Sequence, residues 1–262
     1  MNKFHYCLLL NFALLSPITH SQPLLLTNNT QANFQSYYYQ NWQEVFYDPG
    51  NEDWHTRWFL DGTKAKVSND QQKMTIDTTK NVFAVLWTKE EFKGDLKIEY
   101  DFLRQDDYPH GVNIIYIQAT GSGKSGYDKD ISKWSDKRKN AYMSDYYAHM
   151  HTYHISYATD GDDYIRGRRY MPNQLLPDPA KLWWTAIKGE TKHAGIFADQ
   201  QWIHVTIIKH EKELFVSFQH PNKNIELHME NTDKPGITEG RIGLRLMPKR
   251  LSYFKNISIS TL

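Results

Sequence analysis

Residues 202–218, WIHVTIIKHEKELFVSF, decide the fold class of this chain. Ile203, Val205 and Ile207 form an apolar row at a spacing of two, and more polar residues lie between them. A period of two places neighbouring side chains on opposite faces of a strand, so that one face packs and the other meets solvent. Glu211 and Lys212 interrupt the pattern before a second alternating run begins, which predicts a β-hairpin.

The same spacing recurs along most of the chain and no internal repeat is evident. It predicts strands at 81–88, 95–103, 112–119, 150–158, 164–170, 202–209, 213–219, 241–247 and 254–260. The segment 131–147 differs, because it is charged, rich in tyrosine and only weakly periodic, and we expect a short helix inside a long loop there. Nine or more antiparallel strands predict an all-β sandwich of two antiparallel sheets.

Length and composition indicate a single domain and argue against a nucleic-acid-binding protein. The chain has 262 residues, 40% of them hydrophobic, which suits a single domain with one good core. Its 31 Lys and Arg against 30 Asp and Glu give no basic field of the kind that holds nucleic acid, so no nucleic-acid partner is expected. Aromatic residues make up 14% of the chain, and many stand beside polar residues, which favours stacking on a ligand.

The first 21 residues are typical of a secretory signal peptide. Lys3 precedes an apolar run that ends near Leu15, and small or polar residues follow to Ser21. We expect residues 22–262 to form a single domain that is secreted or periplasmic, with no insertion into a membrane. The only cysteine, Cys7, lies within the signal peptide, so no disulfide is expected in the mature chain.

Two neighbouring predicted strands carry side chains that can bind an anion or transfer a proton. In residues 149–157, HMHTYHISY, alternation directs Tyr157 to the core and leaves His154 and Ser156 on the open face of the sheet. The next predicted strand adds three further side chains that share one face: Arg166, Arg168 and Tyr170. A histidine beside arginines and tyrosines on a sheet suits the binding of an anionic sugar and the transfer of a proton.

This combination fits β-elimination in a uronate polymer. An arginine such as Arg168 neutralises the uronate carboxylate, which makes the neighbouring proton acidic. Neutral His154 or a tyrosine then removes that proton, and a tyrosine protonates the departing glycosidic oxygen. The alternative is structural: His154 hydrogen-bonds a neighbouring strand, and the arginines pair with Asp160, Asp162 and Asp163.

Other motifs are weaker. Glu99 and Asp101 begin a Glu-x-Asp-x-x-Glu pattern of jelly-roll glycosidases, but Arg104 stands where the last acid belongs. His149 and His151 share a strand face with no third metal ligand evident, and the glycine-rich 120–125 is read as a turn rather than a phosphate loop. No cofactor is expected, although a structural calcium ion is left open.

Short motifs along residues 42–260 occur in the order seen in one known family. They are FAVLW at 83–87, EFKGD at 91–95, HISY at 154–157, Arg168-Arg169, and GLRLMP at 243–248. In these the chain resembles the YesU-like family, which is associated with bacterial polysaccharide utilisation. The resemblance implies a concanavalin A-like (lectin/glucanase) β-jelly roll and a carbohydrate substrate.

The resemblance also implies site residues. The family's His-x-Ser-Tyr matches His154, Ser156 and Tyr157, and its conserved arginines match Arg168 and Arg245, while Leu246 replaces a glutamine and Arg169 a lysine. Trp87 matches a further position and either stacks on a sugar ring or packs in the core. The catalytic tyrosine stays open, the candidates being Tyr157, Tyr116, Tyr170, Tyr142, Tyr146 and Tyr147.

The sequence thus predicts a polysaccharide lyase acting on an acidic polysaccharide or oligosaccharide, with His154, Arg168 and Tyr157 as catalytic candidates. The substrate-binding candidates are Arg245, Arg166, Trp87, Tyr170 and Ser156. Two alternatives remain: a non-catalytic glycan-binding jelly-roll module, in which the same face binds sugar without chemistry, and a glycoside hydrolase that uses Glu99 or Asp101.

Overall fold

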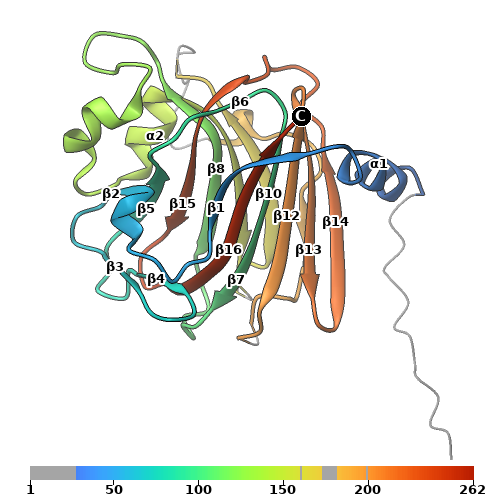
Figure 1. Ribbon diagram of the computed structural model, residues 1–262, viewed down its shortest axis with the longest axis horizontal. Coiled ribbons are helices and arrows are strands. Elements are labelled where there is room, and N and C mark those ends of the chain that lie inside the picture. The colour runs from blue at the N-terminus through green and yellow to red at the C-terminus, as the bar shows by residue number, and fades with distance from the viewer. Residues whose placement is uncertain (1–27, 160, 173–181, 199) are drawn as a thin grey trace, which may run out of the picture.

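A computed structural model describes residues 28–159, 161–172, 182–198 and 200–262, which fold into two eight-stranded antiparallel sheets (Figure 1). The expected signal peptide, residues 1–21, lies outside the described residues. None of the helices within the described ranges is long and apolar enough to cross a membrane.

Sheet A contains the strands predicted around the 202–218 hairpin. Its spatial order is β14 (Lys223–Met229), β13 (Glu213–His220), β12 (Ile203–His210), β7 (Leu96–Arg104), β16 (Leu251–Thr261), β4 (Met74–Asp77) and β3 (Lys66–Asn69), with β1 (Gln43–Asp48) paired to β16. The predicted hairpin is confirmed: His210 pairs with Glu213, and Glu211 turns the chain at a φ of 51°.

Sheet B carries the strands with the candidate site residues. Its spatial order is β11 (Thr191–Lys192), β10 (Tyr164–Tyr170), β9 (Met150–Ala158), β8 (Val112–Gly121), β15 (Glu239–Leu246), β5 (Ala84–Thr88) and β2 (Trp58–Asp61), with β6 (Phe92–Lys93) paired to β15. Strands β9 and β10 have the predicted bounds, whereas β5 begins at Ala84 rather than at Asn81, which has a left-handed φ of 61°.

The main core fills the space between the two sheets. Each inner face contributes the apolar members of its alternating strands, such as Ile98 and Ile207 from sheet A and Ile115 and Ile155 from sheet B. Removing this apolar surface from water is the dominant stabilising contribution to such a sandwich.

A second apolar cluster lies on the opposite, outer face of sheet B. Residues 122–149, which connect β8 to β9, fold over that face as η2 (Ile131–Arg138) and α2 (Met143–His149), so the predicted single helix is two short ones (Figure 1). We call residues 122–149 the cover segment. Trp134 and Tyr146 of the cover segment pack against Trp87 and Tyr116 of the sheet.

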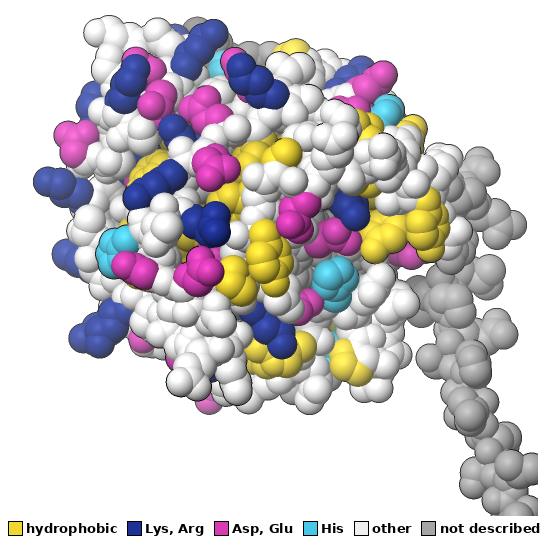
Figure 2. Space-filling model, in the orientation of Figure 1, with side chains coloured by type: hydrophobic (Ala, Val, Ile, Leu, Met, Phe, Trp, Pro, Cys, Tyr) yellow, Lys and Arg dark blue, Asp and Glu magenta, His cyan; other side chains and the backbone are white. Residues whose placement is uncertain are grey.

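The outer face of sheet A is only partly covered. Helix α1 (Asn28–Tyr38) packs Phe34 against Ile208 and Phe215, and two short 3-10 helices, η1 (Trp54–Thr56) and η3 (Leu182–Thr185), lie elsewhere in connections. Figure 2 views this side, where hydrophobic, acidic and histidine side chains are intermixed on the surface.

Candidate functional site

Two rows of side chains cross the outer face of sheet B in register. The first row runs from β10 to β2 through Arg168, His154, Tyr116, Gly243, Trp87 and Phe59. The second runs through Arg166, Ser156, Ile114, Arg245, Val85 and Asp61. Alternation along the strands therefore brings all the candidate site residues onto one face, Tyr170 included, with the exception of Tyr157.

The expectation that this face is open is wrong. The cover segment lies over it, so that His154 is only 3% exposed and Arg245 and Trp87 are fully buried. The sequence pattern located the face correctly but not its covering, because the weak periodicity of 131–147 gave no sign of what that segment packs against.

A buried ion pair anchors the cover segment to the sheet. Asp61 at the end of β2 accepts hydrogen bonds from Arg138 Nε at 2.5 Å, Trp87 Nε1 at 2.7 Å and Tyr146 Oη at 3.1 Å. Both charged side chains are completely inaccessible to solvent. Trp87 is thus held by packing and by Asp61, and its ring stacks on Tyr116 at a centroid distance of 5.3 Å.

His154 and Tyr170 form a hydrogen-bonded pair beneath the cover segment. The Nδ1 atom of His154 lies 2.6 Å from Tyr170 Oη, and Nε2 has no partner among the described residues. Burial, followed by the charges of Arg168, Arg245 and Arg166, holds the pKa of His154 well below its usual value. The imidazole is therefore neutral at physiological pH, as a proton acceptor needs to be.

Arg245 is buried without a counter-charge at hydrogen-bonding distance. Its Nη2 donates to the Ala141 carbonyl at 2.9 Å, while Nε and Nη1 have no hydrogen-bond partner within the described part of the chain. The guanidinium lies 5.4 Å from the centre of the Phe83 ring and 4.8 Å from that of Tyr146. A buried guanidinium with two unused donors is costly for folding, which makes Arg245 a strong candidate for binding an anion.

The remaining candidates have structural partners. Arg166 forms a two-pronged ion pair with Glu190 at 2.8 and 2.7 Å, a partner 24 residues away that no sequence pattern indicated. Nη1 of Arg168 donates to Thr185 Oγ1 at 3.1 Å. Ser156 Oγ donates to the Arg166 carbonyl at 3.4 Å.

Tyr157 lies in the core between the sheets, as alternation predicted. Its hydroxyl is 3.3 Å from that of Tyr100, and burial raises its pKa. This position lies on the opposite side of sheet B from His154 and Arg245, so Tyr157 does not share their site.

A hollow opens at the surface beside Phe83, whose ring packs against the Arg245 guanidinium. It has a cavity volume of about 130 Å³ and is lined by Gly62, Lys64, Asn81, Val82, Phe83, Lys139, Asn140 and Tyr142. We call it the Tyr142 hollow. The Tyr142 side chain is 53% exposed, and its ring meets that of Phe83 edge-on at 5.9 Å. Phe83 separates the hollow from the Arg245 guanidinium, which lies against its ring.

Of the residues that line this hollow, sequence reasoning named only Tyr142 as a site candidate, as part of a tyrosine cluster in the long loop. Lys64 lies in the turn between β2 and β3, and Asn81 lies in the turn between β4 and β5, and folding alone brings them to the cover segment. At Gly62 a Cβ would stand 2.1 Å from the Phe83 carbonyl oxygen, so only glycine permits this close approach of the two turns.

Glu99 and Asp101 lie on the outer face of sheet A, where His204 joins them. His204 Nδ1 is 2.8 Å from Asp101 and Nε2 is 3.9 Å from Glu99. Hydrogen bonds to Asp101 and Glu99 raise the pKa of His204 to about 9, and that of Glu99 is lowered to about 2 through His204 and Lys97 against the effect of burial. Neither carboxyl is protonated at neutral pH, which disfavours the hydrolase alternative because it needs a protonated acid.

The two histidines considered as metal ligands do not converge. His149 ends α2 and stacks on Tyr127 at 3.6 Å, whereas His151 lies in β9. Among the described residues there is no group of three or more His, Cys, Asp or Glu placed to hold a metal ion.

Comparisons with known proteins identify the fold and a family. Residues 49–259 match the model of the family DUF1961, described as a domain of unknown function. A Bacillus subtilis protein of unknown function with a galectin-like fold superposes with a TM-score of 0.65 at 15% identity, covering 83% of this chain and 97% of that one. No curated protein sequence matches the chain.

Two further domains are also similar in structure. The VIP36 exoplasmic/lumenal domain, in a form bound to Ca²⁺ and Man3GlcNAc, gives a TM-score of 0.55 at 11% identity over 81% of this chain and 87% of that one. The carbohydrate recognition domain of Emp47p gives 0.51 at 12% identity over 78% and 87%. The concanavalin-like jelly roll is therefore confirmed, whereas the comparisons do not confirm the YesU-like family.

Proposed function

We propose that this chain, which belongs to the DUF1961 family, is a glycan-binding jelly-roll module whose sugar lies in the Tyr142 hollow. The observation that carries the proposal is the hollow itself, with an exposed aromatic ring and convergent amide and ammonium groups at the edge of sheet B. The structural similarity to the VIP36 domain and the carbohydrate recognition domain of Emp47p supports a carbohydrate ligand.

The lining of the hollow suits a sugar. The exposed Tyr142 ring offers a face on which a pyranose can stack, and the Asn81 and Asn140 amides both donate and accept hydrogen bonds, as hydroxyl groups require. With a cavity volume of about 130 Å³ the hollow is shallow and open to solvent, so it holds one sugar ring against the Tyr142 face rather than enclosing it.

The charges around the hollow favour an acidic sugar. Lys64 and Lys139 line it, and the buried Arg245 guanidinium with its two unused donors lies behind Phe83. None of the described residues that line the hollow carries a carboxylate, so a uronate carboxylate meets cationic or neutral groups among them. We also propose that the protein is exported, on the strength of the apolar N-terminal segment, which brings it to extracellular polysaccharides.

Calorimetric titration with uronate and neutral oligosaccharides tests this proposal. We expect trigalacturonate to bind, and Tyr142→Ala to weaken binding about tenfold, because stacking on an aromatic ring contributes about 1 kcal/mol or more. Tyr39→Ala is the matched control, since Tyr39 is also an exposed tyrosine, at 79%, but lies after α1. Equal affinities of the two variants would place the sugar elsewhere, and binding of neutral oligosaccharides alone would contradict the acidic preference.

A second candidate function is β-elimination, favoured by the 2.6 Å contact between His154 and Tyr170. The neutral imidazole supplies a proton acceptor, the tyrosine a proton donor, and Arg168 and Arg245 raise the positive potential around them. The test is the ultraviolet absorbance of unsaturated uronate when the protein is mixed with polygalacturonate, alginate and glycosaminoglycans. A signal that His154→Ala abolishes supports a lyase, and silence with binding retained leaves the glycan-binding module.

A further inference from the structure

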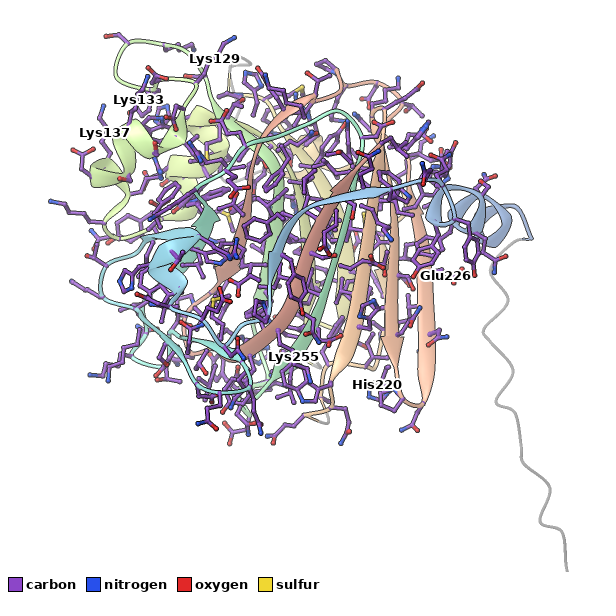
Figure 3. The ribbon with its side chains drawn as sticks, in the orientation of Figure 1. Lys129, Lys133, Lys137, His220, Glu226 and Lys255 are labelled. Atoms are coloured by element: carbon purple, nitrogen blue, oxygen red, sulfur yellow. The ribbon has the colours of Figure 1, made fainter. Side chains whose placement is uncertain are left out.

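The cover segment carries an excess of positive charge on its solvent side. Lys124, Lys129, Lys133, Lys137 and Lys139 are all exposed, and in Figure 3 Lys129, Lys133 and Lys137 follow one another along the outer edge of the molecule. The chain as a whole has a net charge of only +1, so this concentration of lysines within 16 residues is local.

The acidic residues of the same segment offset only part of this charge. Asp130 is engaged by Arg241 Nη2 at 2.9 Å, and Asp128 by Lys133 at 3.1 Å, while Asp136 is exposed. The one arginine of the segment, Arg138, is buried against Asp61 and does not contribute to the surface. The solvent side therefore presents five lysines and two exposed aspartates, and the remaining acid of the segment, Asp145, is half-buried.

A second hollow lies among these lysines. It has a cavity volume of about 500 Å³ and is open to solvent, and its lining includes Lys124, Lys133, Lys137 and Trp134, together with Asp128 and Asp136. Lys137 is held in place, because its ammonium group donates to the Gly126 carbonyl at 2.8 Å and lies 4.5 Å from the centre of the Tyr127 ring. The lysine is thus oriented on the surface while its charge remains exposed.

The two hollows are lined by lysines that are close in the sequence. Lys137 lines the second hollow, and Lys139, two residues further along the cover segment, lines the Tyr142 hollow. We define the lysine track as Lys124, Lys129, Lys133, Lys137 and Lys139. A ligand that occupies the Tyr142 hollow and extends past Lys139 meets the rest of the track.

We infer that the lysine track binds further residues of the same glycan chain, so that the ligand is a polyanionic polysaccharide rather than an isolated acidic sugar. This inference rests on the proposed function of the Tyr142 hollow. Repeated negative charges on one polymer contact several ammonium groups at once, and each contact adds to the affinity without a deep pocket. The contribution of exposed charges is screened by salt, because the Debye length is about 10 Å at 0.1 M.

The experiment compares polygalacturonate polymer with trigalacturonate, using the full chain and calorimetric titration at low and high NaCl. The test variant is Lys129→Gln/Lys133→Gln/Lys137→Gln. The matched control removes three exposed lysines outside the cover segment, Lys66→Gln/Lys93→Gln/Lys188→Gln, and thermal unfolding verifies that both variants are folded.

We expect the track variant to bind the polymer about tenfold more weakly at low salt and to bind trigalacturonate like the unmodified chain. The control variant changes either affinity less than twofold, and added salt weakens polymer binding by the unmodified chain more than by the track variant. Equal loss in both variants, or no loss in the track variant, overturns the lysine track and leaves the Tyr142 hollow. Failure of the unmodified chain to bind polymer or trimer overturns the proposed function itself.

Discussion

The Trp87 indole lies directly over Gly243, its partner across β5 and β15, and a Cβ at position 243 would stand 2.5 Å from two of its ring carbons. The glycine creates the space in which Trp87 stacks on Tyr116 and reaches Asp61. The cover segment packs on Trp87 and Tyr116, so its position on the sheet depends on the space that Gly243 leaves for the Trp87 ring.

Gly243→Ala is therefore expected to destabilise the fold by about 1–3 kcal/mol, the usual cost of overpacking a well-packed interior. Denaturation in urea measures the loss. Gly236→Ala is the control, because the nearest atom to its Cβ is a side-chain carbon of Lys212 at 3.1 Å, at the surface. Equal stability of the two variants would mean that Trp87 moves aside without cost.

The ion pair between Asp61 and Arg138 predicts how the cover segment is released. Asp61→Ala leaves Arg138 buried without its carboxylate, and we expect a loss of about 3–5 kcal/mol. Hydrogen exchange should rise throughout residues 131–149 before it rises in the sheet strands. Asp136→Ala, an exposed aspartate of the same segment, should leave both measurements unchanged. Unaltered exchange in Asp61→Ala would show that apolar packing alone holds the segment.

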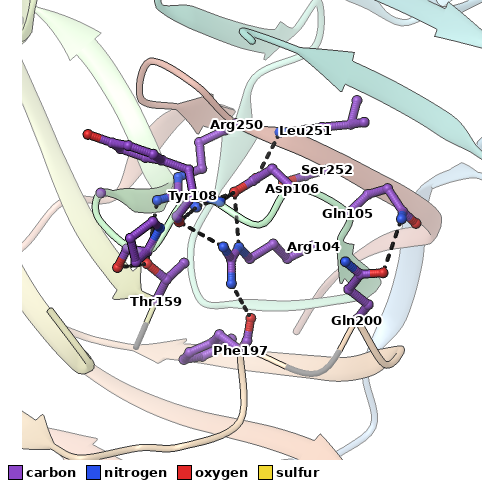
Figure 4. A network of polar contacts seen from close by, with 12 residues as sticks. Arg104, Gln105, Asp106, Tyr108, Thr159, Phe197, Gln200, Arg250, Leu251 and Ser252 are labelled. Atoms are coloured by element: carbon purple, nitrogen blue, oxygen red, sulfur yellow. Dashed lines mark hydrogen bonds and ion pairs between the residues drawn. The ribbon is translucent and has the colours of Figure 1, made fainter. Parts of the chain in front are cut away.

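Two buried arginines at similar depth should respond in opposite ways to replacement. Arg250 is bound through Nη1 to Asp106 at 2.6 Å, and the same carboxylate also contacts Arg104 (Figure 4). Arg250→Met should therefore lose about 2 kcal/mol, as expected for a hydrogen bond to a charged group. Arg245 has no such partner, so Arg245→Met should keep or increase the free energy of unfolding.

The same Arg245→Met variant should weaken the binding of trigalacturonate more than that of a neutral trisaccharide. Such a combination of gained stability and lost affinity is the expected signature of a charge kept for a ligand. A loss of stability comparable with that of Arg250→Met would assign Arg245 to the fold instead.

His204 predicts a pH dependence of stability. Its pKa is raised to about 9 by Asp101 and then Glu99, above its usual value of 6.5. A raised folded-state pKa gives stability that is fully present below the unfolded-state pKa and is lost as the pH rises through about 9. His204→Gln should therefore differ most from the unmodified chain below about pH 6.5 and least above about pH 10. An NMR titration that places His204 near its usual pKa would contradict this.

The alternation of apolar and polar residues predicted the strands well, because each apolar residue in such a run is buried against the core and each polar one faces away from it. The two inner faces were placed correctly for this reason, as were His154, Arg168 and Arg245 on the opposite face of sheet B, and β9 and β10 have the expected bounds. Short strands such as β2 and β6 were missed because too few residues alternate in them to give a period.

The candidate site was only partly predictable. The sequence showed which residues share a face, but not that Asp61 and Arg138, 77 residues apart, close the cover segment over it. One hollow is lined by Lys64, Asn81 and Tyr142, which come from separate turns. Contacts between turns produce no periodic pattern in the sequence, so the hollow could not be predicted from it.

The cover segment enters and leaves the sheet at Gly121 and Met150, which are directly paired across β8 and β9. The two strands therefore need nothing more than a tight turn at this point to keep their alignment, which Ile115 and Ile155 fix from inside the core. An insert of different sequence is compatible with the same strand alignment if it again covers Trp87 and Tyr116 and supplies a partner for Asp61. The sequence of residues 122–149 can therefore vary, and with it the surface proposed to bind the ligand, while the pairing of β8 with β9 is kept.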